Sequence, residues 1–257
     1  MNIVVCVKYV PATADRTFSA VDNTVERADV DGMLCELDEH AVEEALRITE
    51  SGGGEVTVVT AGPEEAADAI ARGLQMGAHR GVHITDDALH GSDAAATSLV
   101  LAAAVRKTGY DIVLCGMAST DGAMGVVPAM LAERLGVPQL TLASQVTVEG
   151  DTVTIRRESP TATEHIEASG PLVLSVTDRS NEPRYPSFKG IMAAKKKPVE
   201  TWSLADLGIA SEVGLAAAGT TVSAFAARPG RTAGQIVSDE GEGGARLVQY
   251  LVAQKLV

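Results

Sequence analysis

The stretch Glu55–Asp86, "EVTVVTAGPEEAADAIARGLQMGAHRGVHITD", alternates between two kinds of hydrophobic pattern. Its two short and nearly continuous apolar runs, EVTVVTAG and GVHITD, are typical of strands that are buried on both faces of a sheet. Between them lies a segment that begins with Pro63 and acidic residues and ends at Gly77, which is typical of a helix. A strand, a helix and a second strand in this order predict a parallel sheet covered by helices.

The same alternation extends to both sides of this stretch. Upstream, "NIVVCVKYV" (residues 2–10) predicts a strand and "LDEHAVEEALRITESGG" (37–53) predicts a helix. Downstream, a helix is predicted at residues 92–109, a strand at 110–116 and a further helix at 125–136. We therefore expect an α/β fold with a doubly wound, mostly parallel sheet of the adenine-nucleotide-binding, Rossmann-like kind.

After about residue 139 the pattern changes to strands and turns. The segments "QLTLASQVTVEGDTVTIRRES", "TEHIEAS" and "GPLVLSVTD" read as strands joined by turn signals such as Glu149-Gly150-Asp151. Some of these strands are expected to form antiparallel hairpins added to the parallel sheet.

Beyond Pro198 the chain is rich in Ala and Gly and has little periodicity, until an amphipathic helix is predicted at residues 242–257. Such a tail cannot bury much apolar surface alone, so it is expected to lie on this domain or on another subunit. The predicted organisation is an α/β nucleotide-binding domain at residues 1–198, followed by an extended C-terminal arm at residues 199–257.

The formal net charge of −13 argues against a general nucleic-acid-binding protein. The charge is unevenly placed, because the segment from Arg179 to Lys197 has six basic residues and one acidic residue. This asymmetry indicates a local docking surface.

The three cysteines, Cys6, Cys35 and Cys115, form no CxxC pair, and are expected to be reduced thiols buried in or near strands. No apolar run approaches 20 residues, and the N-terminus enters a strand pattern at once. We therefore expect a cytoplasmic protein without membrane insertion.

In an open parallel sheet, a ligand binds beyond the carboxyl ends of the strands, where the strand order reverses. If the first strand is central, this crevice is lined by Cys6 to Val10, by Cys35 to Asp38, by Ala61 and by the loop "CGMASTDGAMGVVP" at residues 115–128. That loop leads into a helix whose free backbone N–H groups could hold a phosphate. A plain tight turn is the alternative.

Other motifs are absent. No GxxxxGK[ST] occurs, no GxGxxG follows the first strand, and the five histidines are scattered. No residue is nominated as a catalytic acid, base, nucleophile or metal ligand.

The segment "VTDRSNEPRYPSFKGIMAAKKKP" (residues 176–198) resembles the signature region of the electron transfer flavoprotein β subunit. Further resemblances are "DEHAVEEALR" in the first helix, "VTAGP", "GLQMGAHRGVHITD", "DIVLCG" with its glycine-rich loop, and "RTAG" at Arg231 to Gly234. The resemblance therefore covers nearly the whole chain.

The resemblance implies an electron-carrier subunit without catalytic residues. In the family, an α subunit holds most of a redox-active FAD, and the β subunit binds a structural AMP. The heterodimer passes electrons from acyl-CoA dehydrogenases and similar flavoenzymes to the electron transfer flavoprotein-quinone oxidoreductase of the membrane. The backbone N–H groups of Ala123 to Val127 are expected to hold the AMP phosphate. Carried over by position, the nucleotide site comprises Cys6, Cys35, Glu36, Leu37, Asp38, Ala61, Gly116, Met117, Asp121, Gly122, Ala123, Met124, Gly125, Val126 and Val127.

The resemblance also makes residues 181–198 a recognition loop for partner dehydrogenases. Phe188 stands where the family often has leucine, and it would anchor the loop in a partner pocket. The alternative is that Phe188 folds back on neighbouring apolar side chains. The arm at residues 199–257 would pack on the α subunit. The expected partner-binding residues are Phe188, Arg184, Tyr185, Lys189, Ile191, Met192 and, by looser alignment, Glu164.

Two departures leave alternatives open. The loop "TDGAMGVVP" is more apolar than is usual in the family, and Thr13 stands where the family has a tyrosine that can approach the flavin. A related bifurcating branch carries a second FAD in place of AMP. A stand-alone ATP-binding domain of the stress-protein type would have similar architecture, but would not need the N-E-P-R-Y…K-K-K segment or the long tail.

Overall fold

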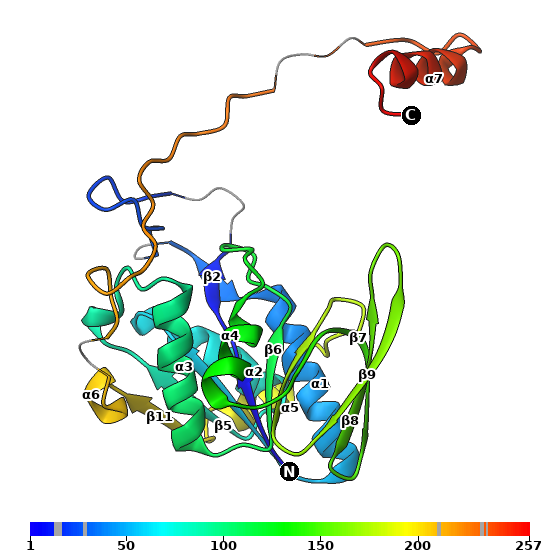
Figure 1. Cartoon of the computed structure of the whole chain (residues 1–257). Helices are drawn as coiled ribbons and strands as arrows, with labels where there is room; N and C mark the ends of the chain where they lie inside the picture. Colours follow the sequence, from blue (N-terminus) through cyan, green and yellow to red (C-terminus); the bar gives the residue numbers. More distant parts are fainter. Residues whose placement is uncertain (13–16, 28–29, 210–211, 232–233, 235) are drawn as a thin grey trace. The chain divides into compact units, whose positions relative to one another are not determined.

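A computed structural model describes residues 1–12, 17–27, 30–209, 212–231, 234 and 236–257 (Figure 1). Thr13 and the middle of the RTAG motif lie outside the described residues. The chain divides into two compact units, Met1–Ser223 and Ala224–Val257.

The strands are β1 (Asn2–Cys6), β2 (Tyr9–Pro11), β3 (Gly32–Leu34), β4 (Glu55–Ala61), β5 (Arg80–Ile84), β6 (Ile112–Gly116), β7 (Gln139–Glu149), β8 (Thr152–Glu158), β9 (Thr163–Ser169), β10 (Leu172–Val176) and β11 (Val199–Trp202). The helices are α1 (Glu36–Gly52), α2 (Ala67–Met76), α3 (Ala94–Thr108), α4 (Val127–Leu135), α5 (Phe188–Ala194), α6 (Leu204–Leu207) and α7 (Gly243–Ala253), with short 3-10 turns η1 (Glu64–Ala66) and η2 (Asp87–Leu89).

A nine-stranded sheet in the order β11-β5-β4-β1-β6-β10-β7-β8-β9 forms the centre of the first unit. Neighbours are parallel from β11 to β7, and the last two pairings, β7 with β8 and β8 with β9, are antiparallel. The predicted doubly wound, mostly parallel sheet with added hairpins is therefore confirmed. A separate antiparallel pair, β2 with β3, follows the end of β1.

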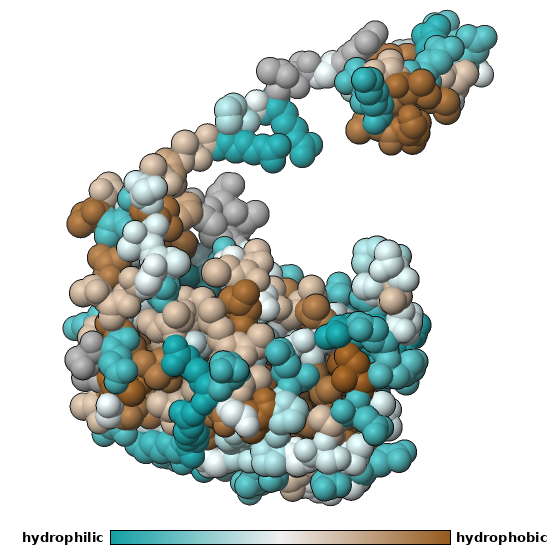
Figure 2. Space-filling model, viewed as in Figure 1, coloured by the Kyte–Doolittle hydropathy of each residue, from teal (hydrophilic) through white to brown (hydrophobic). Residues whose placement is uncertain are grey.

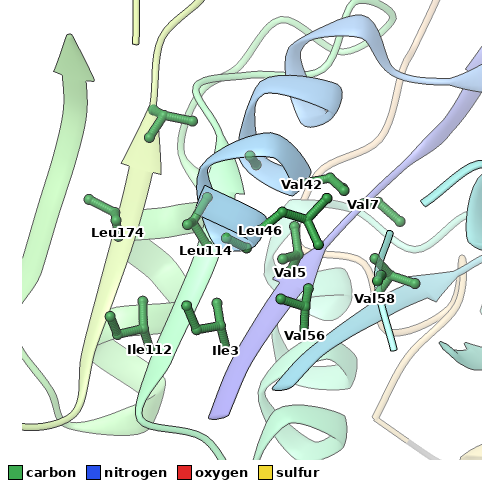
Figure 3. Close-up of a cluster of buried hydrophobic side chains, with 14 of the residues drawn as sticks. Ile3, Val5, Val7, Val42, Leu46, Val56, Val58, Ile112, Leu114 and Leu174 are labelled. Atoms are coloured by element: carbon green, nitrogen blue, oxygen red, sulfur yellow. The ribbon is translucent and has the colours of Figure 1, made fainter. Parts of the chain in front are cut away.

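Side chains alternate across the sheet and bury both of its faces. On β1, Ile3 and Val5 join the core beneath α1 and α2, whereas Val4 and Cys6 join the core beneath α3 and α4. Figure 3 shows the first of these cores, in which Leu46 of α1 lies over the β1, β4 and β6 side chains. Burial of apolar side chains on both faces explains why these strands have continuous apolar sequences.

The compact unit extends beyond residue 198, where the sequence pattern predicted a change of domain. Strand β11 pairs in parallel with β5, from Val199 opposite Gly81 to Trp202 opposite Ile84. Helix α6 then follows and buries Leu204. The unit therefore ends at Ser223. β11 has only four residues, three of them exposed, so it has no recognisable hydrophobic period.

The second unit contains the predicted terminal helix as α7. Leu247, Val248, Tyr250 and Val252 of this helix are all more than half exposed. Figure 2 shows apolar side chains gathered on this helix. In the part of the chain that the structure describes, no helix is both long enough and apolar enough to cross a bilayer.

Candidate functional site

The strand order reverses between β1 and β6. From β1 the chain proceeds outward on one side to β4 and β5, and then returns to form β6 on the other side of β1. Cys6 and Cys115 are register partners at the carboxyl ends of these two strands, and both are buried, as is Cys35. The predicted burial of the cysteines is confirmed, and the switch-point crevice lies beyond this pair.

Asp38, in the first turn of α1, ties the two strand ends together. Its Oδ2 accepts the Lys8 backbone N–H at 2.8 Å, and its Oδ1 accepts the Gly116 N–H at 3.2 Å. Burial raises the pKa of the Asp38 carboxyl from about 4 to about 7, even though the two N–H donors favour the carboxylate. The buried Asp38 carboxyl therefore links the segment after β1 to the end of β6 by two hydrogen bonds.

We expect the substitution Gly116→Ala to destabilise the protein. A Cβ on Gly116 would lie 2.5 Å from Asp38 Oδ1 and 2.7 Å from the Leu37 carbonyl oxygen. Overpacking of this kind costs about 1–3 kcal/mol, and the displaced carboxylate adds to that loss. Urea unfolding followed by the fluorescence of the single tryptophan, Trp202, measures the change. Gly52→Ala is the control, because its Cβ would meet nothing within 4 Å, and an equal effect of the two substitutions would contradict the packing argument.

The loop from Gly116 to Val127 folds back on itself before α4 begins. The Ser119 carbonyl oxygen accepts the Ala123 N–H at 2.8 Å, and Ala123 and Gly125 adopt positive φ angles of 51° and 65°. The Ala123 N–H is therefore already used. Among the described residues, no acceptor contacts the N–H groups of Met124, Gly125, Val126 and Val127. Two of these N–H groups, those of Val126 and Val127, belong to the N-cap and first residue of α4, and those of Met124 and Gly125 to the loop before it. Such a set of N–H groups is suited to binding an anion.

Two cations converge on Asp121 in this loop. Lys8 Nζ lies 2.9 Å from Asp121 Oδ1, and Arg27 Nη2 lies 2.5 Å from Oδ2. The Asp121 side chain is only 1% exposed. Although burial opposes its ionisation, the charges and hydrogen bonds of Lys8 and Arg27 hold the pKa of Asp121 well below its ordinary value.

Neither cation was among the predicted site residues. Lys8 had a signal in the sequence, since it is the one charged residue within the apolar run at residues 2–10. Arg27 had none, because it lies 94 positions from Asp121 along the chain. Both are long-range partners that a local pattern does not identify.

Most of the predicted nucleotide-site residues are brought together at this edge. Cys35 precedes α1 and its Sγ lies 3.8 Å from the Ala118 carbonyl oxygen, so the start of α1 touches the loop. Ala61 ends β4, one strand away, and is half-buried. Glu36 is exposed and Leu37 half-buried in the first turn of α1. In the loop, Met117 is half-buried and Gly122 and Met124 are exposed, whereas the side chain of Asp121 is buried and only its backbone is partly exposed.

A hollow of about 380 Å³ lies elsewhere, between β3 and α2, lined by Leu34, Asp68 and Arg72 among others. None of the predicted nucleotide-site residues lines this hollow, whereas the two cations Lys8 and Arg27 lie at the switch-point loop.

The segment at residues 181–198 is fixed to α1 by polar contacts. Arg184 Nε lies 2.7 Å from Glu43 Oε2 and its Nη1 lies 2.6 Å from Glu50 Oε1. Asn181 Nδ2 donates to Glu44 Oε2 at 2.8 Å. Arg184, predicted to bind a partner, is thus engaged within the chain and holds the segment in place.

Within this segment, residues predicted as a loop form the short helix α5. Ser187 caps it by accepting the Gly190 N–H, and Gly190 packs so closely on α2 that a Cβ would lie 2.6 Å from the Gln75 carbonyl oxygen. Lys197 Nζ donates to the Leu74 carbonyl oxygen at 2.9 Å, which holds the end of the segment on α2.

Helix α5 and Tyr185, which precedes it, present large side chains to solvent. Phe188 is 80% exposed and Tyr185 is 85% exposed, and Met192 is about half exposed. Ile191 is half-buried and Lys189 is exposed. Phe188 therefore does not fold back into a buried cluster with its apolar neighbours.

Residues 22–207 match the family model "Electron transfer flavoprotein domain". "Electron transfer flavoprotein subunit beta" of Mycobacterium tuberculosis (strain ATCC 25618 / H37Rv) is 50% identical over 264 residues, which cover 100% of this chain and 99% of that protein. This chain belongs to the electron transfer flavoprotein β-subunit family.

Relatives of the same description extend to other bacteria. The protein of Mycobacterium leprae (strain TN) is 49% identical over 100% of this chain and 99% of its own length. The protein of Clostridium acetobutylicum is 37% identical over 92% of each. The match to the electron transfer flavoprotein domain includes both the 116–127 loop and the α5 segment.

In this electron transfer flavoprotein subunit, Glu164 lies on β9, the open edge of the sheet. It is 47% exposed and pairs with Arg157 on β8, with Nε and Oε2 2.9 Å apart. Hydrogen bonding by Arg157 lowers the pKa of this carboxyl. The pair leaves one edge of Glu164 exposed, which is compatible with a contact to another chain.

The stability of the subunit is expected to fall as the pH rises from about 4 to about 7, through Asp38. Its folded-state pKa is raised to about 7, so in this window the folded state binds more protons than the unfolded state. Asp38→Asn removes this contribution, whose slope is at most about 1.4 kcal/mol per pH unit.

The measurement is the free energy of unfolding of both proteins between pH 5 and pH 7.5. We expect the stability of the wild type relative to Asp38→Asn to decrease across this range, and the exposed-turn variant Asp151→Asn serves as the control. A difference that does not change with pH would contradict the buried-carboxyl account.

Proposed function

We propose that this chain is the β subunit of a heterodimeric electron transfer flavoprotein that takes electrons from acyl-CoA dehydrogenases and similar flavoenzymes. The heterodimer delivers them to the membrane-bound electron transfer flavoprotein-quinone oxidoreductase, as in fatty-acid oxidation in the cytoplasm. The chain is a carrier subunit and not itself an enzyme. The observation that supports this role best is Phe188, 80% exposed on a segment that is fixed to α1.

The contacts that hold residues 181–198 on α1 and α2 favour docking. Since Arg184 and Asn181 hold the start of the segment and Lys197 holds its end, little conformational freedom remains to be lost on binding. An exposed aromatic side chain on a segment held in this way can contribute most of the binding free energy of an interface. Phe188 is the anchor in this proposal, with Tyr185 and Met192 beside it.

The lysines of the segment have a separate role. Lys189, Lys195 and Lys196 are exposed and have no ion-pair partner among the described residues. Exposed charges at an interface accelerate the encounter more than they tighten the complex. They would steer an acidic dehydrogenase surface toward Phe188.

The switch-point loop fits the phosphate of AMP. The N–H groups of residues 124–127, which have no acceptor among the described residues, and the two cations at Asp121 supply donors and positive charge for an anion. AMP would support the fold and take no part in electron transfer. The FAD supplies the redox chemistry when bound, and it is held mostly by the α subunit.

The α subunit is the proposed partner of the second unit. Helix α7 exposes Leu247, Val248, Tyr250 and Val252, each more than half, and neighbouring exposed apolar side chains of this kind favour a contact with another protein surface. In the proposed heterodimer, the arm that includes Ala224–Val257 covers these side chains by packing on the α subunit.

Co-expression with the α subunit tests this function. The purified heterodimer should contain FAD, which an acyl-CoA dehydrogenase and its substrate should reduce, and quinone oxidoreductase should then reoxidise it. A stable monomer of this chain that binds ATP and does not bind the α subunit would instead support the stand-alone nucleotide-binding function.

A further inference from the structure

Arg27 is the last residue of the described segment 17–27, which lies between β2 and β3 in the chain. Phe18 and Val25 form an antiparallel bridge, and Asn23 turns the chain with a φ angle of 59°. The tip is held independently of Arg27, since His90 Nε2 lies 2.7 Å from Asp22 Oδ2. This segment therefore has a structure of its own and brings Arg27 to the switch-point loop.

At the loop, only part of the Arg27 guanidinium is used. Nη2 donates to Asp121 Oδ2 at 2.5 Å. Nη1 is buried, and no acceptor contacts it among the residues that the structure describes. A buried charged donor without an acceptor is unfavourable, so such a group is expected to have a partner that completes the site.

The charged side chains around Asp121 do not balance one another. Lys8 and Arg27 contribute two positive charges and Asp121 one negative charge, so these three side chains carry one positive charge in excess, which the carboxyl of Asp38 offsets in part. Lys8 Nζ also reaches Ser119 Oγ at 3.4 Å, and the buried Asp38 carboxyl lies nearby, on the Lys8 backbone N–H. The residual charge and the free N–H groups at the start of α4 favour a ligand with several anionic oxygens.

We propose that Arg27 donates its buried Nη1 to the phosphate of the bound nucleotide, and that the Lys8–Asp121–Arg27 network selects a nucleoside monophosphate over the nucleoside. This inference rests on the AMP site of the proposed function. Asp121 has no direct contact with the phosphate in this arrangement. It positions both cations, which explains why a buried carboxylate lies in an anion site.

The test is calorimetric titration of the nucleotide-stripped heterodimer with AMP and with adenosine. For Arg27→Ala, the affinity for AMP should fall roughly 10- to 100-fold, since a charge-assisted hydrogen bond is lost. The affinity for adenosine should stay within about twofold. Val21→Ala is the matched control, because Val21 is 95% exposed in the same segment and its truncation breaks neither the Asp22–His90 contact nor the Arg27–Asp121 pair, and it should bind AMP like the wild type.

Arg27→Lys should retain part of the preference for AMP, because lysine keeps the charge but loses the planar pair of donors. It also provides a second variant if Arg27→Ala fails to fold. Equal losses for AMP and adenosine in an Arg27 variant, or no loss for AMP, would overturn the inference. Failure of the wild-type heterodimer to bind AMP would instead overturn the AMP site itself.

Discussion

Phe188→Ala is expected to weaken the complex between the heterodimer and an acyl-CoA dehydrogenase by roughly 30- to 700-fold. Truncation of a central aromatic anchor costs about 2–4 kcal/mol of binding free energy, and each 1.4 kcal/mol is a factor of ten. Phe188 is already exposed in the free chain, so its removal leaves no cavity in the core. The fold, the FAD content and the stability should therefore remain those of the wild type.

The measurement is the rate of flavin reduction by the dehydrogenase as a function of heterodimer concentration. The loss should appear in the concentration needed for half-maximal rate. Val21→Ala is the control, because Val21 is an exposed apolar residue outside the segment and its removal should change nothing. Unchanged docking by Phe188→Ala, with FAD and AMP still bound, would show that residues 181–198 are not the docking segment.

Arg184→Ala is expected to destabilise the protein and to impair docking together. Its removal leaves the Glu43 carboxylate, 8% exposed, without its cation, and leaves Glu50 beside it. Removing one partner of a fully buried ion pair costs about 3–5 kcal/mol. Because Arg184 is one-third exposed, we expect about 2–3 kcal/mol here.

Thermal unfolding and dehydrogenase titration of the same variant separate the two effects. Glu50→Gln is the milder comparison, since Glu50 is exposed and Glu43 would keep its bidentate partner. Arg184→Ala should weaken docking because the segment that presents Phe188 loses its tether to α1. If docking falls while stability is unchanged, Arg184 contacts the partner directly and the tether account is wrong.

The fold was predictable where a strand is buried on both faces. Ile3, Val4 and Val5 are each at most 1% exposed, and a run of this kind leaves an unambiguous sequence pattern. Strand β11 and helix α5 were not predicted, because each is short and mostly exposed and is stabilised by contacts distant in sequence. Gly190 against Gln75 and β11 against β5 are examples.

In the candidate site, too, local features were predictable from the sequence and long-range contacts were not. The crevice followed from strand order, and the loop from its glycines, both of which are local features. The ion pairs of Asp121 were not predicted, since Lys8 lies 113 positions away and Arg27 94. Arg184 was predicted as a residue of the docking segment, but its contacts with Glu43 and Glu50 were visible only after folding.

Nucleotide analysis of the heterodimer tests the central claim most directly. The chain is co-expressed with its α subunit, the complex is purified and heated, and the released AMP and FAD are quantified. The proposed function predicts equal amounts of AMP and FAD. A twofold excess of FAD without AMP would contradict it in favour of a subunit with its own flavin, and neither nucleotide in the complex, with ATP on the free chain, would contradict the electron-carrier role.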